Sequence, residues 1–422
     1  MRRLVTLGVV VFGLLTLTAC SSGKKDDNNA AEPTPAEADQ SSDTAEEVPA
    51  EPTQAEVFVE ICEKRSGEPS QHATSDAIRQ WFAEDFGAFV GCQDVYEFYN
   101  TPNFSAPLFL VDKAVTDISL IEFFENLGTF VSAQNQIEDW SPLGSRTGLQ
   151  VVSIVGSNLT KVPDELVGKA LTRLILGSAP ITDFSNLAQI TTLELISLNN
   201  MELTAIPEEV TSSGQLQVLI MDGNPLADVS ALASIPSLTV LSLFNTGIST
   251  VPAEVANLAN LSVLEVSNNP MGGDGAFAAL DQNASIVELY AEGTELTAVP
   301  IEIGSMAALE ILFIGENALI TDYTGLGANA SILGVRMNGN ALAEVPVAVP
   351  LLLQLEALGA NRNEITSVAP LAPMASLQVL GLAENPIATQ ANKNTANCPS
   401  GDAVASPAIN TFCAGVTAAP AQ

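Results

Sequence analysis

The sequence predicts an α/β solenoid of about 13 stacked coils, with a parallel sheet on one face and little helix on the other. A motif of spaced aliphatic residues returns every 22–25 residues between residues 105 and 390, and a period in this range is typical of repeat architectures. The composition agrees with this interpretation. Hydrophobic residues make up 47% of the chain but aromatic residues only 5%, which suits many small aliphatic coils better than one large core.

Each repeat contains a short aliphatic segment followed by a position that is often Asn. The template is the stretch 216–226, in which Leu219 and Met221 precede Asn224. Alternate residues of a strand point to the same side, so this spacing predicts a short strand with its aliphatic residues inward. The Asn position of the other twelve repeats is occupied by Lys113, Asn135, Ser157, Ala179, Met201, Thr246, Asn269, Thr294, Asn317, Asn340, Asn363 and Asn385. A buried Asn there can bond the backbone of its own coil and of the next coil, so we expect a ladder of Asn side chains, weakened at the six replaced positions.

This pattern resembles the leucine-rich repeat family, whose signature is LxxLxLxxNxL. The segment 181–187, which belongs to the other half of a coil, resembles the internalin type of bacterial repeat. The resemblance implies a horseshoe with the sheet on its concave face and recognition of a protein on that face, an argument by fold-level analogy. The short coils and their Pro residues leave no room for convex α-helices, so we expect 3₁₀ or extended segments there. The one 25-residue step contains a Gly-rich stretch, 271–275, interpreted as a tolerated surface loop.

The two ends of a solenoid need caps, because they would otherwise expose its apolar interior. Residues 57–104 are predicted to form a helical N-terminal cap, and residues 391–422 a C-terminal cap and tail. The residues that favour an N-terminal helical segment recur at helical spacing and are Ile78, Trp81, Phe82, Phe86, Phe89 and Val90. Four cysteines, Cys62, Cys92, Cys398 and Cys413, allow three pairings in a secreted chain. We expect Cys62–Cys92 and Cys398–Cys413, which close the shortest loops and bracket opposite caps.

The N-terminus has the features of a secretory signal. Arg2 and Arg3 precede an apolar stretch in residues 1–19, and this stretch is too short for a spanning helix. The ending 17–20 resembles a bacterial lipobox, which implies cleavage before Cys20 and acylation of that cysteine with fatty acids such as palmitate. Ser21 resembles an outer-membrane sorting signal of Gram-negative lipoproteins. The expected location is therefore the cell envelope, anchored by lipid to the outer membrane.

Residues 20–56 comprise the lipidated cysteine and a tether rich in Ala, Pro, Ser and acidic residues. They have no apolar periodicity from which a core could form, so we expect them to be disordered and to hold the solenoid off the membrane. A second apolar run, 345–360, is interrupted by Pro346, Pro350, Gln354 and Glu356, and cannot span a bilayer.

The charge and motif content excludes several classes of function. With 15 Lys and Arg against 49 Asp and Glu, the net charge is -34, and such a surface repels nucleic acid. The only histidine is His72, so no site with two imidazole ligands can form. The chain lacks a nucleophile elbow, a phosphate loop, a CxxC pair and a calcium-binding loop. We therefore predict no catalytic residue, cofactor or metal, and a function other than enzymatic catalysis.

Charge is also segregated along the chain, since residues 174–335 contain eighteen acidic residues and no Lys, Arg or His. One interpretation is that these acidic side chains do no more than keep a secreted solenoid soluble. The alternative is a binding surface formed by the outward positions of the strands, which we name the acidic–aromatic patch. Its members are Asp222, Phe244, Glu265, Glu288, Tyr290, Glu292, Phe313 and Glu316, with Arg336 on the next strand.

Tyr290 and Phe313 occupy equivalent positions on adjacent strands, roughly 4.8 Å apart in strand spacing. Aromatic side chains exposed among acids are typical of a protein-binding surface, here for a partner with basic and apolar groups. The competing interpretation is that these large side chains only cover the sheet. The rival function is that of a structural envelope lipoprotein without a discrete ligand site. The sequence leaves the oligomeric state open.

Overall fold

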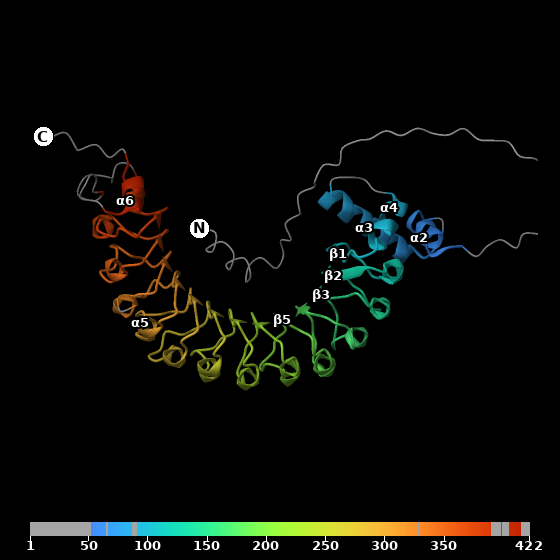
Figure 1. The fold of residues 1–422 in the computed structure, drawn as a ribbon, viewed down its shortest axis with the longest axis horizontal. Coiled ribbons are helices and arrows are strands. Elements are labelled where there is room, and N and C mark those ends of the chain that lie inside the picture. Colours follow the sequence, from blue (N-terminus) through green and yellow to red (C-terminus); the bar gives the residue numbers. More distant parts are fainter. Residues whose placement is uncertain are drawn as a thin grey trace, which may run out of the picture. The chain divides into compact units, whose positions relative to one another are not determined.

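The computed structural model describes residues 52–64, 66–86, 91–327, 329–389, 398 and 405–414. The expected signal peptide, Cys20 and nearly all of the expected tether lie outside these residues. Within them, thirteen strands form a single sheet in the order β1 to β13, and every pair of neighbours is parallel (Figure 1). The sheet lines the inner side of a curved stack of coils, as the sequence predicts.

The first five strands are longer than the rest, which have three residues each. Their bounds are β1 Ala106–Val111, β2 Leu127–Ala133, β3 Val151–Val155, β4 Arg173–Gly177, β5 Leu195–Asn199, β6 Val218–Ile220, β7 Val240–Ser242, β8 Val263–Glu265, β9 Glu288–Tyr290, β10 Ile311–Phe313, β11 Gly334–Arg336, β12 Ala357–Gly359 and β13 Val379–Gly381. The middle residues of the short strands are aliphatic and pair in register, for example Leu219 with Leu241 and Leu241 with Leu264. These side chains are buried inside the coils and form one continuous core, against which the partly buried Leu380 of β13 packs.

The outer side of the described coils consists mostly of short 3₁₀ segments, which confirms the expected lack of convex α-helix. Their bounds are η1 Ser119–Phe123, η2 Ser141–Leu143, η3 Asp164–Leu166, η4 Ser185–Gln189, η5 Glu208–Ser212, η6 Ser230–Ser234, η7 Ala253–Asn257, η8 Ala278–Gln282, η9 Thr324–Leu326, η10 Val349–Leu351, η11 Ala369–Leu371 and η12 Pro386–Ala388. One coil has a single α-helical turn instead, α5, Glu302–Ser305.

The expected Asn ladder is present, but its bonds between coils reach the preceding coil and not the next one. The Asn224 side chain accepts hydrogen bonds at Oδ1 from the backbone N–H groups of Met201 (2.9 Å) and Leu203 (3.1 Å). Its Nδ2 donates to the carbonyls of Leu198 and Met221, both at 2.7 Å. Two of the replaced positions keep part of this pattern, because the hydroxyls of Thr246 and Thr294 each donate to a carbonyl of their own coil at 2.9 Å.

Three helices form the N-terminal cap: α2 Gln54–Cys62, α3 Pro69–Phe86 and α4 Cys92–Tyr99. The expected boundary at residue 57 was wrong, since α2 begins three residues earlier, inside the expected tether. The reason is that Phe58 of this helix is buried against Phe124 of the solenoid, with ring centroids 5.6 Å apart. The apolar contact fixes the helix although its first residues carry no apolar pattern.

The predicted cap residues Ile78, Trp81 and Phe82 are buried, whereas the side chain of Phe86 and the whole of Phe89 and Val90 lie outside the described residues. At the other end, α6, Pro407–Phe412, packs against β13. Its residue Ala408 donates a backbone hydrogen bond to the carbonyl of Leu377 at 3.1 Å.

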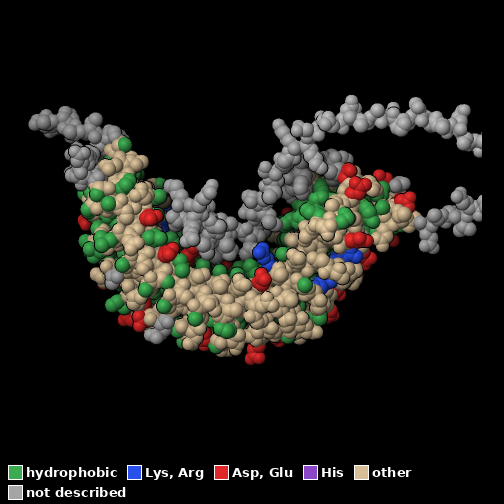
Figure 2. Space-filling model, viewed as in Figure 1, with side chains coloured by type: hydrophobic (Ala, Val, Ile, Leu, Met, Phe, Trp, Pro, Cys, Tyr) green, Lys and Arg blue, Asp and Glu red, His purple; other side chains and the backbone are tan. Residues whose placement is uncertain are grey.

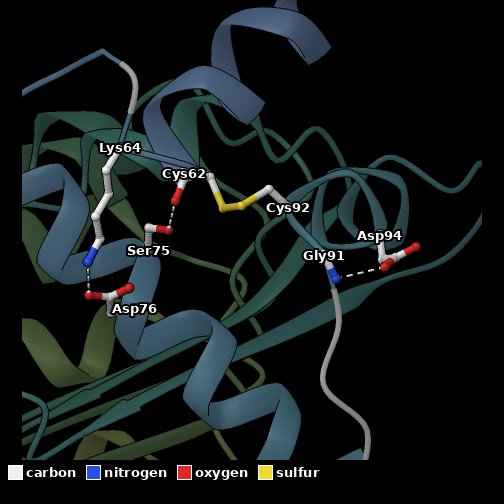
Figure 3. Close-up of a disulfide and its surroundings, with 7 residues drawn as sticks. All are labelled: Cys62, Lys64, Ser75, Asp76, Gly91, Cys92 and Asp94. Carbon is white, nitrogen blue, oxygen red and sulfur yellow. Dashed lines mark hydrogen bonds and ion pairs between the residues drawn. A yellow bond between two sulfur atoms is a disulfide. The ribbon is translucent and has the colours of Figure 1, made fainter.

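Both expected disulfides are present, Cys62–Cys92 with a Cα–Cα distance of 5.8 Å and Cys398–Cys413 with 5.5 Å. The first joins α2 to α4 beside a hydrogen bond from the Ser75 hydroxyl to the Cys62 carbonyl (Figure 3). Replacing Cys62 and Cys92 together by Ala should lower the free energy of unfolding by roughly 3 kcal/mol, because the 30-residue loop gains freedom in the unfolded chain.

In that variant, amide hydrogen exchange should accelerate in α2–α4 before it does in the central coils, because each coil contacts only its neighbours. Equal acceleration in the cap and in β6–β8 would contradict this localised role of the disulfide.

Candidate functional site

The register of the sheet brings the centre of the acidic–aromatic patch into one row. Ser242, Glu265, Tyr290, Phe313 and Arg336 are successive partners across β7–β11. They are the last residues of their strands, so their side chains follow one another along the concave face. The predicted juxtaposition of Tyr290 and Phe313 is therefore confirmed.

The aromatic part of this row is a stack that ends on a cation. The rings of Tyr290 and Phe313 are nearly parallel, with centroids 4.5 Å apart and an interplanar angle of 7°. The guanidinium carbon of Arg336 lies 5.5 Å from the centroid of Phe313, within the range of a cation–π interaction. Its Nε is 3.5 Å from a carboxylate oxygen of Glu292. A guanidinium is thus held here by an aromatic face and a carboxylate together.

Three members of the patch are less accessible than the sequence predicted. Tyr290, Glu265 and Glu288 are only 8%, 3% and 8% exposed, so the expectation that they project freely from the sheet was wrong. The stack with Phe313 covers one face of Tyr290, and the Tyr290 hydroxyl donates to the Glu288 carboxylate at 2.8 Å. Strands about 4.8 Å apart bring such long side chains into lateral contact. For Tyr290, the interpretation that large side chains cover the sheet is therefore partly right.

The other members of the patch remain accessible. Asp222, Phe244, Glu292 and Phe313 are half-buried, and Glu316 and Arg336 are exposed. Two further participants were not foreseen. Ser267 donates its backbone N–H to Glu265, and Arg362 forms an ion pair with Glu316. The sequence contains a signal for this ion pair. Arg362 stands directly before Asn363 and Glu316 directly before Asn317, so the two side chains occupy equivalent positions of their coils.

Burial changes the acidity of the carboxylates in the patch. It raises the pKa of Glu265 to about 7, although the carboxylate accepts the Ser267 N–H at 2.6 Å, and the nearby acids Asp222 and Glu292 add to the effect. Burial also raises the pKa of Asp222, against hydrogen bonds from the Ser242 hydroxyl (2.6 Å) and the Phe244 N–H (3.2 Å). The pKa of Glu292 is raised by burial and lowered in part by Arg336. A cation that approached these groups would stabilise their ionised forms.

The stability of the chain should fall as pH rises from about 5 to about 8. The pKa of Glu265 lies above 4.5 in the folded chain, so the folded state keeps this proton to a higher pH than the unfolded state does. Denaturant titrations at the two pH values should show a loss on the order of 2 kcal/mol from this group.

Glu265→Gln, which retains an acceptor for the Ser267 N–H, should remove that part of the loss. The control Glu208→Gln, at an exposed convex position, should leave the pH-dependent loss of stability unchanged. If the stability of Glu265→Gln fell with pH as steeply as that of the natural chain, the loss could not be assigned to Glu265.

The described residues contain no group of three or more His, Cys, Asp or Glu side chains arranged to hold a metal ion. None of their helices is long and apolar enough to cross a membrane. A hollow of 730 Å³ lies elsewhere on the coils, where the Gly-rich stretch 271–275 meets the next two coils, and Asp274, Ile301 and Asp322 line it. No member of the acidic–aromatic patch contributes to it.

The sequence matches no profile of a known protein family and no curated protein, but solved structures share the architecture. A leucine-rich repeat protein of Leptospira interrogans is 19% identical, with 68% of this chain and 86% of that chain covered and a TM-score of 0.48. An internalin of Listeria monocytogenes is 22% identical, with 76% and 86% covered and a TM-score of 0.49. TLR13, in a complex with ssRNA13, is 18% identical, with 63% of this chain and 41% of that chain covered and a TM-score of 0.53. The repeat geometry described above, with the likeness to TLR13, defines a leucine-rich repeat fold, and the likeness extends to the fold alone.

Proposed function

We propose that this chain is a protein-binding module of the cell envelope, which takes its partner on the concave face at the acidic–aromatic patch. The observation that supports this best is the environment of Arg336, whose guanidinium lies against Phe313 and Glu292. A basic group of a partner would compete with Arg336 for these side chains. A carboxylate beside an aromatic face suits Lys and Arg, and aromatic residues are enriched in the cores of protein interfaces.

The chemistry of the patch defines the partner as a protein with basic and apolar surface. Phe244 and Phe313 offer half-buried aromatic surface, while Asp222, Glu292 and Glu316 supply negative charge. Nucleic acid fits poorly, because its phosphates would meet this same charge. The ssRNA bound by TLR13 is a property of that protein.

The proposed anchor is a lipid on Cys20, attached after removal of residues 1–19, with the acidic segment that follows as a tether from the outer membrane. Replacing Cys20 by Ser should move the protein from the detergent phase of a phase-partitioning experiment into the aqueous phase, because the acyl chains supply the membrane affinity. The control Cys398→Ser, at the opposite end of the chain, should leave the partitioning unchanged. A Cys20→Ser protein that stays in the detergent phase would refute the anchor.

The experiment that tests the binding function compares an immobilised fragment 52–422 with its charge-reversed variant Glu292→Lys/Glu316→Lys. The fragment starts before Gln54, because a start at residue 57 would truncate α2. A partner should bind the natural fragment saturably, bind more weakly at higher salt and be lost from the variant. A structural lipoprotein without a ligand site is the rival, and it predicts equal, non-saturable retention on both.

A further inference from the structure

Two arginine side chains of the chain itself occupy part of the acidic–aromatic patch. Arg336 lies against the ring of Phe313 and beside the carboxylate of Glu292. Arg362 forms an ion pair with Glu316. Each ion pair joins two coils that are not neighbours and passes over the coil between them. Figure 2 shows acidic side chains along the inner margin of the arm that Figure 1 colours yellow to orange.

Two glycines on the intervening coils make room for these ion pairs. A Cβ atom added to Gly315 would lie 2.9 Å from Oε1 of Glu292. A Cβ atom added to Gly339 would lie 2.8 Å from Oε1 of Glu316. Both separations are well inside the roughly 3.5 Å at which non-bonded heavy atoms pack best. The carboxylates therefore lie over backbone that carries no side chain, and a group above the sheet can reach them.

The contacts that hold the two arginines are of a kind that exchanges readily. The Nε of Arg336 lies 3.5 Å from the Glu292 carboxylate, farther than the roughly 2.7–2.9 Å of a charge-assisted hydrogen bond. The side chains of Arg336 and Arg362 are 48% and 50% exposed. Ion pairs this exposed add little to stability, because water and salt screen them. Another cation can therefore replace either arginine at little cost to the fold.

We propose that Arg336 and Arg362 hold the places that arginine side chains of the partner take when it binds. The inference rests on the proposed concave binding function and specifies the basic groups of the partner. A guanidinium is planar, so it can stack on Phe313 and present two N–H groups to the Glu292 carboxylate. The ammonium of lysine has neither a flat face nor a fork of donors. Arg336 already demonstrates that a guanidinium fits against this ring.

Occupation by its own arginines makes the patch selective. A partner binds only after it displaces them, so its apparent affinity is reduced by the fraction of molecules in which they are displaced. A partner with several arginines regains more contacts than it breaks, whereas a single weakly held cation does not. The displaced Arg336 has a place to go, because its successive partners across β12 and β13 are Gly359 and Gly381. These glycines present no side chain that would block it.

Isothermal titration calorimetry of residues 20–422 with Cys20→Ser tests the inference with two capped peptides, one of four Gly-Arg repeats and one of four Gly-Lys repeats. We expect the arginine peptide to bind about threefold more tightly, the factor that a cation–π contact at an exposed site supplies. Arg336→Gln/Arg362→Gln should raise the affinity for the arginine peptide by about fivefold, because two exposed ion pairs no longer compete.

The matched control is Lys161→Gln/Arg173→Gln, which also removes two positive charges. It also frees a carboxylate, that of Asp164, from an ion pair, but on coils outside the patch. It should change the affinity by about twofold at most, since a distant charge acts only through the screened field. Phe313→Ala should abolish the preference for arginine over lysine, and circular dichroism would establish that each variant is folded.

Three results would overturn the inference: an Arg336→Gln/Arg362→Gln chain that binds no more tightly than the control, equal affinity of the natural chain for the two peptides, and binding of neither peptide. The proposed function would survive any of them if fragment 52–422 still retained a partner that Glu292→Lys/Glu316→Lys loses. Equal retention on that pair of fragments, with the peptide results as expected, would instead remove the proposed function.

Discussion

Replacing Asn224 by Ala is expected to lower the free energy of unfolding by about 3 kcal/mol or more. The side chain is fully buried and satisfies two backbone N–H groups and two carbonyls from two coils. Alanine leaves these groups without partners in the interior, at a cost of about 1–3 kcal/mol for each unsatisfied group. Urea denaturation monitored by circular dichroism measures the loss.

Asn224→Thr is the matched control, because the chain itself uses Thr at this position of two other coils. The Thr246 hydroxyl bonds a carbonyl of its own coil, but threonine is too short to replace the bonds to Met201 and Leu203. The control should therefore lose less stability than the Ala variant, while hydrogen exchange at amides 201 and 203 accelerates in both. Equal stability of the two variants would contradict the ladder as a source of stability.

The strands and the ladder could be predicted because the same local pattern returns thirteen times in one chain. A single LxxLxL segment is ambiguous, but a register held across coils fixes which side of each strand is buried. The start of α2 at Gln54 lacked such support. It depends on Phe58 packing against Phe124, a contact between residues far apart in the sequence.

The limits on predicting the candidate site have a similar physical origin. The alternation of side chains along a strand gives the face on which Tyr290 and Glu265 lie, and that much was right. It does not give the lateral contacts between coils, which depend on side-chain length and rotamer. Arg336 reaches past Phe313 to Glu292, two coils away, and no spacing within one repeat contains that information.

Truncating the aromatic stack is expected to have the largest effect on partner binding. Phe313→Ala should weaken binding by about 2 kcal/mol, roughly thirtyfold, as for a partly buried aromatic anchor. It should also release Arg336 from its aromatic surface. Surface plasmon resonance with the partner that the immobilised fragment 52–422 retains measures the change, and Ile301→Ala, at an exposed convex position, is the control.

Tyr290→Ala should weaken binding by a similar amount, but it is also expected to affect the fold, because the ring is buried against Phe313 and its hydroxyl bonds Glu288. Tyr290→Phe separates the two effects, since it keeps the stack and removes only the hydroxyl. If the stack is the anchor, Tyr290→Phe binds nearly as well as the natural chain, and Phe313→Ala binds poorly although its unfolding transition is preserved. Binding that survives Phe313→Ala/Tyr290→Ala in a folded protein would move the partner site away from the acidic–aromatic patch and leave the acidity of residues 174–335 as a solubility feature.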